Sequence, residues 1–323
     1  MEEKTSLDLK DRKILFEMDM NARIPLTQLA KKIGLSPQTT KYRIKQLEKK
    51  GIVRNYVTFF DVSKFGYMYY RVYFRYENIK FGEENKIIDY FKDNKNVVWL
   101  ISTTGRWDLE VLFVARNFIH FNDILKRCYS RFPGKLHNNI TSVSVANYHH
   151  PRSYLLNKKS DIQISYGGEP QEIKIDENDK KIIKLINQNA RLTSVEIGGK
   201  VGLNYKTVQA RLIKLEEKRI IQAYRTWIDI SKIGSTYRKA MIKLKKFTDK
   251  EEKIILEFCR QNMNIVYLIT CAWPWEIEIE VESEEEKTFL DILSEFRKLM
   301  GNLIIDYEIL TVTKEHKLNY YPF

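Results

Sequence analysis

The sequence predicts an α+β protein made of two three-helix domains and two βαββαβ domains, arranged as a pseudo-two-fold dimer within one chain. The main observation is an internal repeat: the stretch from Asp8 to Gly66 recurs 168 positions later, from Asp176 to Gly234. After each copy, strand-like and helix-like segments follow in the same order. A repeat of this length indicates the architecture before any local pattern is considered. Two similar units in one molecule are expected to pair about a pseudo-two-fold axis.

Each copy begins with three predicted helices. In the first copy, Asp8 precedes apolar residues at helical spacing and is placed to cap the first helix. The second helix ends at Gly34, and Ser36 followed by Pro37 opens a third helix that runs to about Lys50. The second copy repeats these signals at Asp176, Gly202 and Asn204. Two helices, a glycine turn and a capped helix form the pattern of a helix-turn-helix.

The third helix of each copy turns a polar and basic face outward. Lys and Arg neutralise phosphates, while Gln, Thr and Tyr side chains can reach base edges. Our candidates for base reading are Gln38, Thr39, Lys41 and Tyr42 in the first copy and Tyr205, Lys206 and Gln209 in the second. We expect Lys45, Arg43 and Arg211 to contact phosphate, although the two arginines could instead brace the helix against its neighbours. A purely structural three-helix unit is the alternative to DNA binding.

The distribution of charge favours a polyanionic partner. The formal net charge is +13. Residues 1–66 carry 14 Lys/Arg against 8 Asp/Glu, and residues 173–234 carry 13 against 7, so the basic excess recurs in the helix-turn-helix part of each copy. Double-stranded DNA is therefore the expected partner. After each third helix, residues 51–59 and 219–227 are rich in β-forming residues, which predicts a small wing or hairpin.

The rest of each copy has the order βαββαβ, which predicts a ferredoxin-like domain. In the first copy the expected elements are residues 67–76, 83–93, 97–104, 107–115, 118–132 and 140–148. In the second copy they are residues 237–246, 249–261, 264–271, 275–282, 286–299 and 303–313. The offset between copies drops to 167 at Gly134 and Gly301, so His149 and His316 are expected to be equivalent.

A capped helix-turn-helix, a β-linker and a βαββαβ domain with the turn Thr104-Gly105-Arg106-Trp107-Asp108 resemble the Lrp/AsnC (feast/famine) transcription regulators. The resemblance covers both repeats. It implies DNA binding by the helix-turn-helix, dimerisation through the sheets of the ferredoxin-like (RAM) domains, and a possible amino-acid-like effector. The weak candidates for effector binding are Thr104, Gly105, Arg106 and Asp108. The second turn, Trp273-Pro274-Trp275-Glu276, departs from the pattern, so we expect at most one ordinary effector pocket per chain.

The expected domains are a helix-turn-helix at 1–55, a RAM-like domain at 56–150, a linker at 151–172, a second helix-turn-helix at 173–223 and a second RAM-like domain at 224–323. The stretch 151–172 holds Pro151, a Gly167-Gly168 pair and Pro170 among polar residues. A linker of this length makes pairing of the two halves intramolecular. Further homo-oligomerisation through other RAM surfaces is a second expectation.

One strand of the second copy alternates four carboxylates with apolar residues, namely Glu276, Glu278, Glu280 and Glu282. Alternate residues of a strand share a sheet face. Two explanations remain open. The carboxylates could pair with Lys239, Lys243 and Lys245 on the neighbouring strand. Alternatively, this face could dock against the first copy, where Arg71 and Arg75 lie beside Asp108 and Glu110, and so favour pairing of unlike halves.

Other functional classes have weaker support. No apolar run approaches the ~20 residues needed to span a bilayer, the N-terminus lacks a signal-peptide core, and three cysteines without paired spacing predict reduced thiols and a cytoplasmic protein. No His, Cys or carboxylate spacing predicts a metal site, and no phosphate loop or nucleophile motif predicts an enzyme or a cofactor. A fused enzyme similar to siroheme decarboxylases, which share this fold, and a DNA-free architectural protein are the alternatives.

Overall fold

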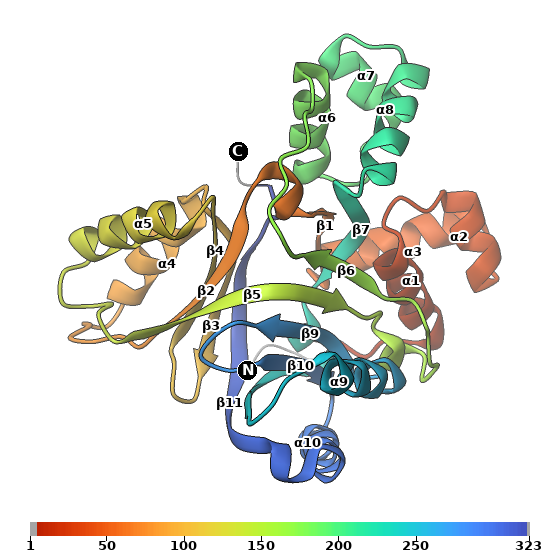
Figure 1. The fold of residues 1–323 in the computed structure, drawn as a ribbon. Helices are drawn as coiled ribbons and strands as arrows, with labels where there is room; N and C mark the ends of the chain where they lie inside the picture. Colours follow the sequence, from red (N-terminus) through yellow and green to blue (C-terminus); the bar gives the residue numbers. More distant parts are fainter. Residues whose placement is uncertain (1–4, 322–323) are drawn as a thin grey trace.

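The computed structural model describes residues 5–321, in which two helix-turn-helix domains lie beside a central β-barrel (Figure 1). The first domain consists of α1 (Leu9–Met20), α2 (Leu26–Ile33) and α3 (Pro37–Lys49). The second consists of α6 (Glu177–Gln188), α7 (Ser194–Val201) and α8 (Tyr205–Glu217). Within residues 5–321, no helix has the length and apolar character needed to cross a membrane.

The predicted caps and turns form in both copies. The Asp8 and Asp176 carboxylates accept hydrogen bonds from the backbone N–H groups of Asp11 and Asp179, each at 2.8 Å. Gly34 and Gly202 adopt left-handed backbone conformations with φ of 67° and 73°, which end α2 and α7 at little steric cost. These local signals explain why the three-helix units could be recognised in the sequence.

The two βαββαβ domains follow the expected order. The first contains β2 (Met68–Phe74), α4 (Glu83–Asp93), β3 (Val97–Thr104), β4 (Leu109–Ala115), α5 (Phe118–Arg131) and β5 (Asn139–His149). The second contains β8 (Thr236–Leu244), α9 (Asp249–Gln261), β9 (Ile265–Cys271), β10 (Ile277–Ser283), α10 (Glu286–Met300) and β11 (Ile304–Leu318). The fold class is therefore α+β, as predicted.

The two sheets are joined along both edges. The strand order β2-β4-β3-β11-β8-β10-β9-β5 closes on itself because β5 also pairs with β2. Strand β3 pairs with β11, and β5 pairs with β9, so each copy supplies half of one closed antiparallel barrel. Closure leaves none of these eight strands as a full-length free edge. The pseudo-dimer was expected to pack sheet to sheet, and the structure adds continuous backbone pairing between the copies.

The strands after the recognition helices pair between the copies. Strands β1 (Val53–Phe60) and β7 (Ile221–Ile228) run antiparallel to each other, with Thr58 opposite Tyr224. The β-structure expected after each third helix, a small wing or hairpin, therefore forms between the copies. A strand with an apolar face gains from pairing with its equivalent across the pseudo-two-fold axis, and a sequence pattern does not distinguish that partner from a neighbour in the chain.

The stretch between the two halves is partly structured. It includes the short 3-10 helix η2 (Ser153–Leu155) and strand β6 (Ile164–Gly167), which pairs antiparallel with β5. Residues Arg152, Ser153, Leu155 and Tyr166 are buried. Backbone hydrogen bonds from Gln171 to Ser63 and from Ile173 to Lys64 continue the attachment. The segment predicted as a linker thus packs against both halves of the molecule, since Arg152 and Tyr154 also bond to Glu282 of β10.

Strand pairing corrects the alignment of the last strands. His149 lies opposite Tyr267 of β9, and Leu318 lies opposite Trp99 of β3. Because Tyr267 and Trp99 are repeat equivalents, His149 is equivalent to Leu318 and not to His316 as expected. A register irregularity between Glu315 and Lys317 accommodates an additional residue in β11. The sequence offset between the copies was taken from the alignment of Gly134 with Gly301 in a loop. The register of strand pairing gives the correct offset for the last strands.

Candidate nucleic-acid interface

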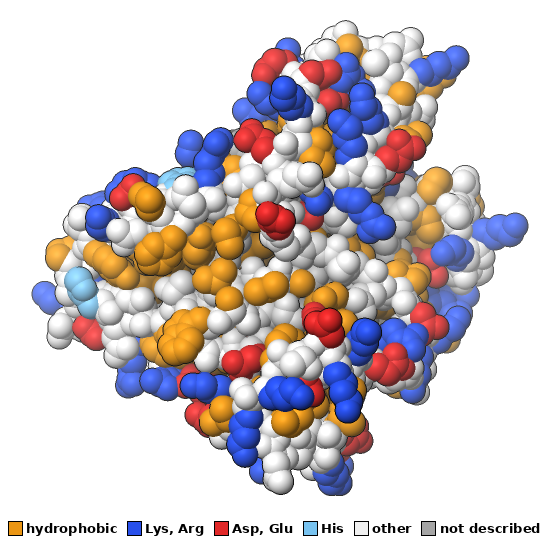
Figure 2. Space-filling model, in the orientation of Figure 1, with side chains coloured by type: hydrophobic (Ala, Val, Ile, Leu, Met, Phe, Trp, Pro, Cys, Tyr) orange, Lys and Arg blue, Asp and Glu red, His pale blue; other side chains and the backbone are white. Residues whose placement is uncertain are grey.

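The recognition helix of the first copy presents its predicted contact residues to solvent. Gln38, Thr39, Lys41, Tyr42 and Lys45 are exposed on α3, and the Tyr42 side chain is 63% exposed. Thr40, Ile44 and Leu47 form the buried stripe that holds the helix in its domain. Lysine and arginine side chains are spread over both helix-turn-helix domains in Figure 2. This face therefore combines cations with side chains able to read bases.

The second recognition helix is also outward-facing but less basic. Tyr205, Lys206 and Gln209 are exposed on α8, above the buried residues Val208, Leu212 and Leu215. Ile213, which is 53% exposed, takes the position of Lys45. An exposed isoleucine offers no charge to a phosphate, so the two contact surfaces are chemically different.

Arg43 and Arg211 brace the recognition helices instead of extending to solvent. The Arg43 guanidinium donates to Asp8 at 2.7 Å and to Asp11 at 2.8 Å. Arg211 donates in the same way to Asp176 and Asp179, at 2.6 and 2.7 Å. The backbone N–H of Asp11, together with the Arg43 guanidinium, lowers the pKa of Asp8. Of the two roles considered for these arginines, the geometry of the free protein favours the brace over the phosphate contact.

Each helix-turn-helix domain is anchored to the strand of the other copy. The Thr226 hydroxyl of β7 donates to the Met18 carbonyl of α1 at 2.9 Å, and the Thr58 hydroxyl of β1 donates to the Ile186 carbonyl of α6 at 2.7 Å. The Ala22 N–H also donates to Tyr224 at 2.8 Å. This crossed arrangement fixes both recognition helices relative to the β1–β7 ribbon, as a dimeric DNA reader requires.

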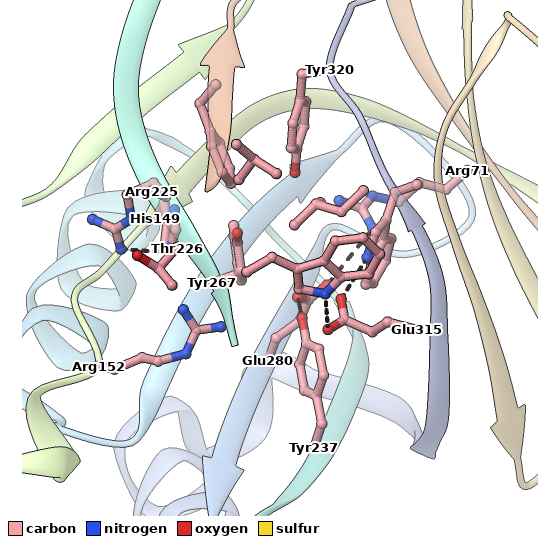
Figure 3. Close-up of a pocket in the computed structure, with 15 residues that line it drawn as sticks. Arg71, His149, Arg152, Arg225, Thr226, Tyr237, Tyr267, Glu280, Glu315 and Tyr320 are labelled. Atoms are coloured by element: carbon pink, nitrogen blue, oxygen red, sulfur yellow. Dashed lines mark hydrogen bonds and ion pairs between the residues drawn. The ribbon is translucent and has the colours of Figure 1, made fainter. Parts of the chain in front are cut away.

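A buried ionic network adds a second anchor to the first helix-turn-helix domain. Asp19 of α1 accepts from Arg152 at 2.8 Å and from Arg225 of β7 at 3.2 Å. Arg152 also donates to both carboxylate oxygens of Glu282, each at 2.8 Å. Figure 3 shows Arg152, Arg225 and His149 together beside an internal cavity. We refer to Asp19, Arg152, Arg225 and Glu282 as the Asp19 network.

His149 adjoins this network in a defined neutral form. Arg225 lies 2.8 Å from His149 Nε2, and because arginine can only donate, Nε2 accepts and the proton resides on Nδ1. Burial and the neighbouring Arg225 hold the pKa of His149 well below its usual value. The histidine therefore serves as a hydrogen-bond acceptor inside the protein.

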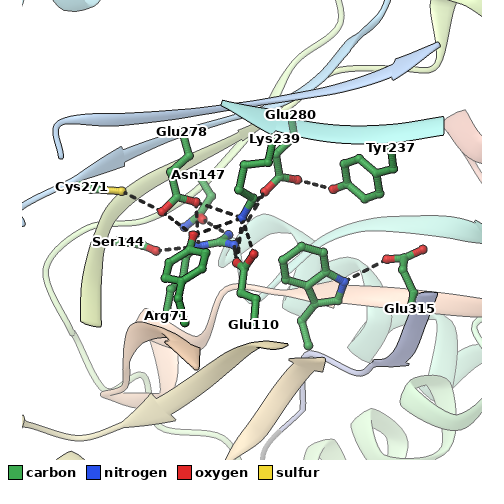
Figure 4. Close-up of polar contacts among 12 residues, drawn as sticks. Arg71, Glu110, Ser144, Asn147, Tyr237, Lys239, Cys271, Glu278, Glu280 and Glu315 are labelled. Atoms are coloured by element: carbon green, nitrogen blue, oxygen red, sulfur yellow. Dashed lines mark hydrogen bonds and ion pairs between the residues drawn. The ribbon is translucent and has the colours of Figure 1, made fainter. Parts of the chain in front are cut away.

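A second ionic cluster fills the barrel interior between the sheets (Figure 4). Arg71 and Lys239 contact Glu110 at 2.8 and 2.7 Å, and Lys239 also contacts Glu278 at 3.1 Å and Glu280 at 3.0 Å. Burial raises the pKa of Glu278, but Lys239 and Arg71 outweigh it and lower that pKa to about 2. Both explanations of the carboxylate face hold here, since Lys239 pairs within its own sheet and also across to the first copy.

Some of the predicted members of this cluster lie elsewhere. Arg75 is exposed, and Asp108 accepts from the backbone N–H of Tyr76 at 2.8 Å. Lys243 is exposed and lies over the Trp273 ring, and Lys245 is also exposed. The alternation of residues was correct, but these positions lie beyond the part of the sheet that the opposite sheet covers.

The effector-associated turn of the first copy is packed against the second copy. A Cβ atom on Gly105, whose φ is 128°, would lie 2.9 Å from the Ile309 carbonyl oxygen of β11. Arg106 forms an ion pair with Glu308, and the Trp107 indole donates to the same carboxylate at 3.2 Å. Thr104 is exposed at the end of β3. In the second turn, Trp275 donates to Glu278 at 2.8 Å and so supports the barrel cluster.

Sequence reasoning missed the Asp19 network. Its four members lie in four separate parts of the chain, and no motif connects them. One available signal was a difference between the copies at equivalent positions of the repeat: Asp19 is matched by Asn187, and Arg225 by Val57. Buried charges are retained in proteins only with partners, so a charge present in one copy alone is a hint of a specific contact.

Comparisons with known proteins agree with this geometry. A family model for the winged helix-turn-helix DNA-binding domain matches residues 7–54 and 175–222. An uncharacterized HTH-type transcriptional regulator of Pyrococcus furiosus is 29% identical over 123 residues, which are 38% of this chain and 79% of the relative. The regulator LrpA of Pyrococcus horikoshii is 39% identical over 61 residues, 19% of this chain and 43% of LrpA.

A full-length structural similarity is found with another protein. The siroheme decarboxylase NirDL, solved with an iron-uroporphyrin III analogue, aligns with a TM-score of 0.60 over 98% of this chain and 94% of its own. The sequences are 11% identical, so this similarity concerns the fold alone. With two winged helix-turn-helix domains, two ferredoxin-like domains and regulators such as LrpA among its relatives, the chain is similar to a tandem duplication of the unit of Lrp-type transcription regulators.

Proposed function

We propose that the protein is a transcription regulator that binds specific double-stranded DNA with both recognition helices in major grooves. The observation that carries the proposal is the pair of outward-facing capped helices, with Gln38, Thr39, Lys41 and Tyr42 on one and Tyr205, Lys206 and Gln209 on the other. Lys45 supplies a phosphate contact beside the first set. Because the two faces differ, the preferred site is asymmetric or an imperfect palindrome.

A small-molecule effector is a secondary part of the proposal. Resemblance to Lrp-type regulators supports an amino-acid-like ligand or further homo-oligomers. Thr104 and Arg106 remain the accessible candidates at the first turn, whereas Gly105 and Asp108 are committed to internal contacts. Equilibrium binding of amino acids to the intact chain, compared with an Arg106→Ala variant, tests this turn. Unchanged affinity in the variant assigns any effector to another site.

The salt dependence of DNA binding tests the main proposal. Phosphate contacts release counterions, so the logarithm of the association constant falls linearly with the logarithm of salt concentration. Lys41→Ala and Lys206→Ala should each weaken binding and reduce that slope by about one. Lys253→Ala, an exposed lysine of α9, is the matched control. Slopes unaffected by Lys41→Ala and Lys206→Ala exclude these residues from the interface, and absence of salt-sensitive binding favours a DNA-free architectural role.

The fold similarity to siroheme decarboxylase is the observation that favours a second candidate, an enzyme acting on a tetrapyrrole. The internal cavity beside His149 measures about 20 Å³, enough for about one water molecule. Among residues 5–321, no group of three or more His, Cys, Asp or Glu side chains is placed to hold a metal ion. We place this enzyme second to the regulator because the relatives that match in sequence are named transcriptional regulators. A spectral change on titration with siroheme, followed by loss of carboxyl groups, supports the enzyme instead.

A further inference from the structure

The two copies differ at one edge of the barrel. In the first copy, strand β6 pairs with the end of β5, with Tyr166 opposite Asn147 and Ile164 opposite His149. Tyr166 is buried, and its ring packs against the rings of Phe59 and Tyr69 at centroid distances of 6.2 and 6.0 Å. This strand extends the sheet beyond the point where β2 ends.

The equivalent edge of the second copy has no such strand. Pairing of β11 with β8 ends at Val312, opposite Tyr237, while β11 continues to Leu318 along β3. Among residues 5–321, no strand pairs with Lys314–Leu318 on the side away from β3. Strand register makes Glu315 the equivalent of Asn147, the residue that Tyr166 faces in the first copy. The unpaired edge of β11 therefore corresponds to the edge of β5 with which β6 pairs in the first copy.

A groove of about 940 Å³ lies along this edge. Its walls come from the end of α3 and the start of β1, from the loop between β7 and β8, and from residues Val312, Thr313, Lys314 and Glu315 of β11. The loop is positioned as in the first copy, because the Thr5 N–H donates to Lys232 as the Ile173 N–H donates to Lys64. A groove of this size accommodates an extended segment of several residues.

The groove provides the contacts that a strand needs. Tyr237, which lines the groove, and Trp227, whose indole donates to Glu315 at 3.2 Å, are the repeat equivalents of Tyr69 and Phe59, which pack against Tyr166. The Glu315 carbonyl, a backbone acceptor on β11, receives a hydrogen bond of 2.6 Å from the exposed Arg54 side chain. Ser235 lines the groove with a buried hydroxyl that has no hydrogen-bond partner, and its equivalent in the first copy is the larger Tyr67.

We propose that this groove accepts one extended peptide segment of a partner protein, which adds a strand antiparallel to the Lys314–Leu318 edge of β11. The segment resembles Ile164–Gly167: an aromatic residue lies opposite Glu315 against Trp227 and Tyr237, and glycine follows it. Main-chain hydrogen bonds supply affinity, and the aromatic side chain supplies selectivity. The Arg54 side chain must release the Glu315 carbonyl as the strand enters.

The test uses the full chain and a labelled peptide with the sequence of residues 160–172. Fluorescence anisotropy should show saturable binding, and a peptide with Tyr166→Ala should bind at least about tenfold more weakly. Amide hydrogen exchange should slow at Lys314–Leu318 on binding. The protein variant Ser235→Tyr narrows the groove and should reduce affinity by about tenfold or more. The repeat already accommodates tyrosine at the equivalent position, Tyr67, so this variant is expected to fold.

Three results would overturn the proposal. The first is absence of saturable binding. The second is binding that Ser235→Tyr leaves unchanged while circular dichroism confirms a folded variant. The third is a change in amide exchange confined to β5, which means that the peptide replaces β6 in the first copy instead of occupying the second.

Discussion

The two helix-turn-helix domains are attached to the β1–β7 ribbon by equivalent hydrogen bonds, but the charges at the two attachments differ. Thr226 holds α1 and Thr58 holds α6 through equivalent bonds to helix carbonyls. At the first attachment, the buried carboxylate of Asp19 on α1 contacts Arg152 and Arg225. At the equivalent positions the second attachment has Asn187 on α6 and Val57 on β1.

This difference shows what duplication within one chain allows. In a homodimer both attachments have the same sequence, so an arginine introduced at the position of Val57 and Arg225 would be present in both subunits. Here one attachment is ionic and buried, while the other has uncharged residues at the equivalent positions. Buried charges contribute little net stability but specify a geometry, because a misplaced partner leaves a charge uncompensated. We infer that the first domain is held in one orientation and that the second has more rotational freedom.

The largest expected effect comes from removing the carboxylate of the Asp19 network. Asp19→Ala leaves Arg152 and Arg225 with less compensation inside the protein, which should lower the free energy of unfolding by about 3–5 kcal/mol. Asn187→Ala, the matched change in the second attachment, should lower it by less than about 1 kcal/mol because Asn187 is half-exposed. Urea unfolding of both variants measures the difference. Equal losses would mean that the two attachments are energetically alike.

Acid should weaken the first attachment through His150, which follows His149 in the chain. Burial, with a contribution from Arg225, lowers the pKa of His150 from its usual 6.5 to about 4. The folded state thus holds His150 neutral, so its contribution is present above pH 6.5 and is lost as the pH falls towards 4. The loss can reach about 3 kcal/mol. Unfolding measured between pH 7 and 4 should show a shallower decline for His150→Phe, and an identical decline assigns the acid sensitivity to other groups.

The fold could be predicted from the sequence to the extent that it depends on local signals. Asp8, Gly34 and Ser36 mark helix ends by chemistry that acts within a few residues, and the repeat doubles each signal. The pairing of β1 with β7 and the closure of the barrel through β3 and β11 depend on partners distant in the chain. An alternating pattern indicates which face of a strand is buried but not which strand lies beside it. These pairings could therefore not be predicted from the sequence.

The exposed contact residues of the recognition helices could be predicted from the sequence, whereas the buried ionic networks could not. Exposure of Lys41 and Tyr42 follows from helical periodicity once the buried stripe is known. Arg43 and Arg211 lie at the border of that stripe, where a long side chain can turn either way, and only the neighbouring Asp11 and Asp179 decide its direction. Asp19 looked like an ordinary helix-surface residue, since its burial is created by strands of the other copy.

Replacing Arg43 or Arg211 should therefore reduce stability by a similar, small amount in either copy. Arg43→Ala and Arg211→Ala each remove a half-exposed brace, which should lower the free energy of unfolding by about 0.5–1 kcal/mol. The salt slope of DNA binding should be unchanged, because the guanidinium groups are engaged by carboxylates. Parallel measurements of urea unfolding and of DNA binding at several salt concentrations check both expectations. A slope reduced by about one in either variant would restore that arginine as a phosphate contact.

The smallest change concerns the contact faces themselves. Ile213 of α8 is exposed where α3 has Lys45, so Ile213→Lys makes the second face more like the first. If both helices lie against DNA as proposed, the substitution adds one phosphate contact and raises the salt slope by about one, with little change in stability. Lys45→Ile, the reciprocal variant, should lower the slope by the same amount. A response to Lys45→Ile without a response to Ile213→Lys would mean that only the first, ionically fixed domain approaches the phosphate backbone at this position, while the second reads DNA from a different angle.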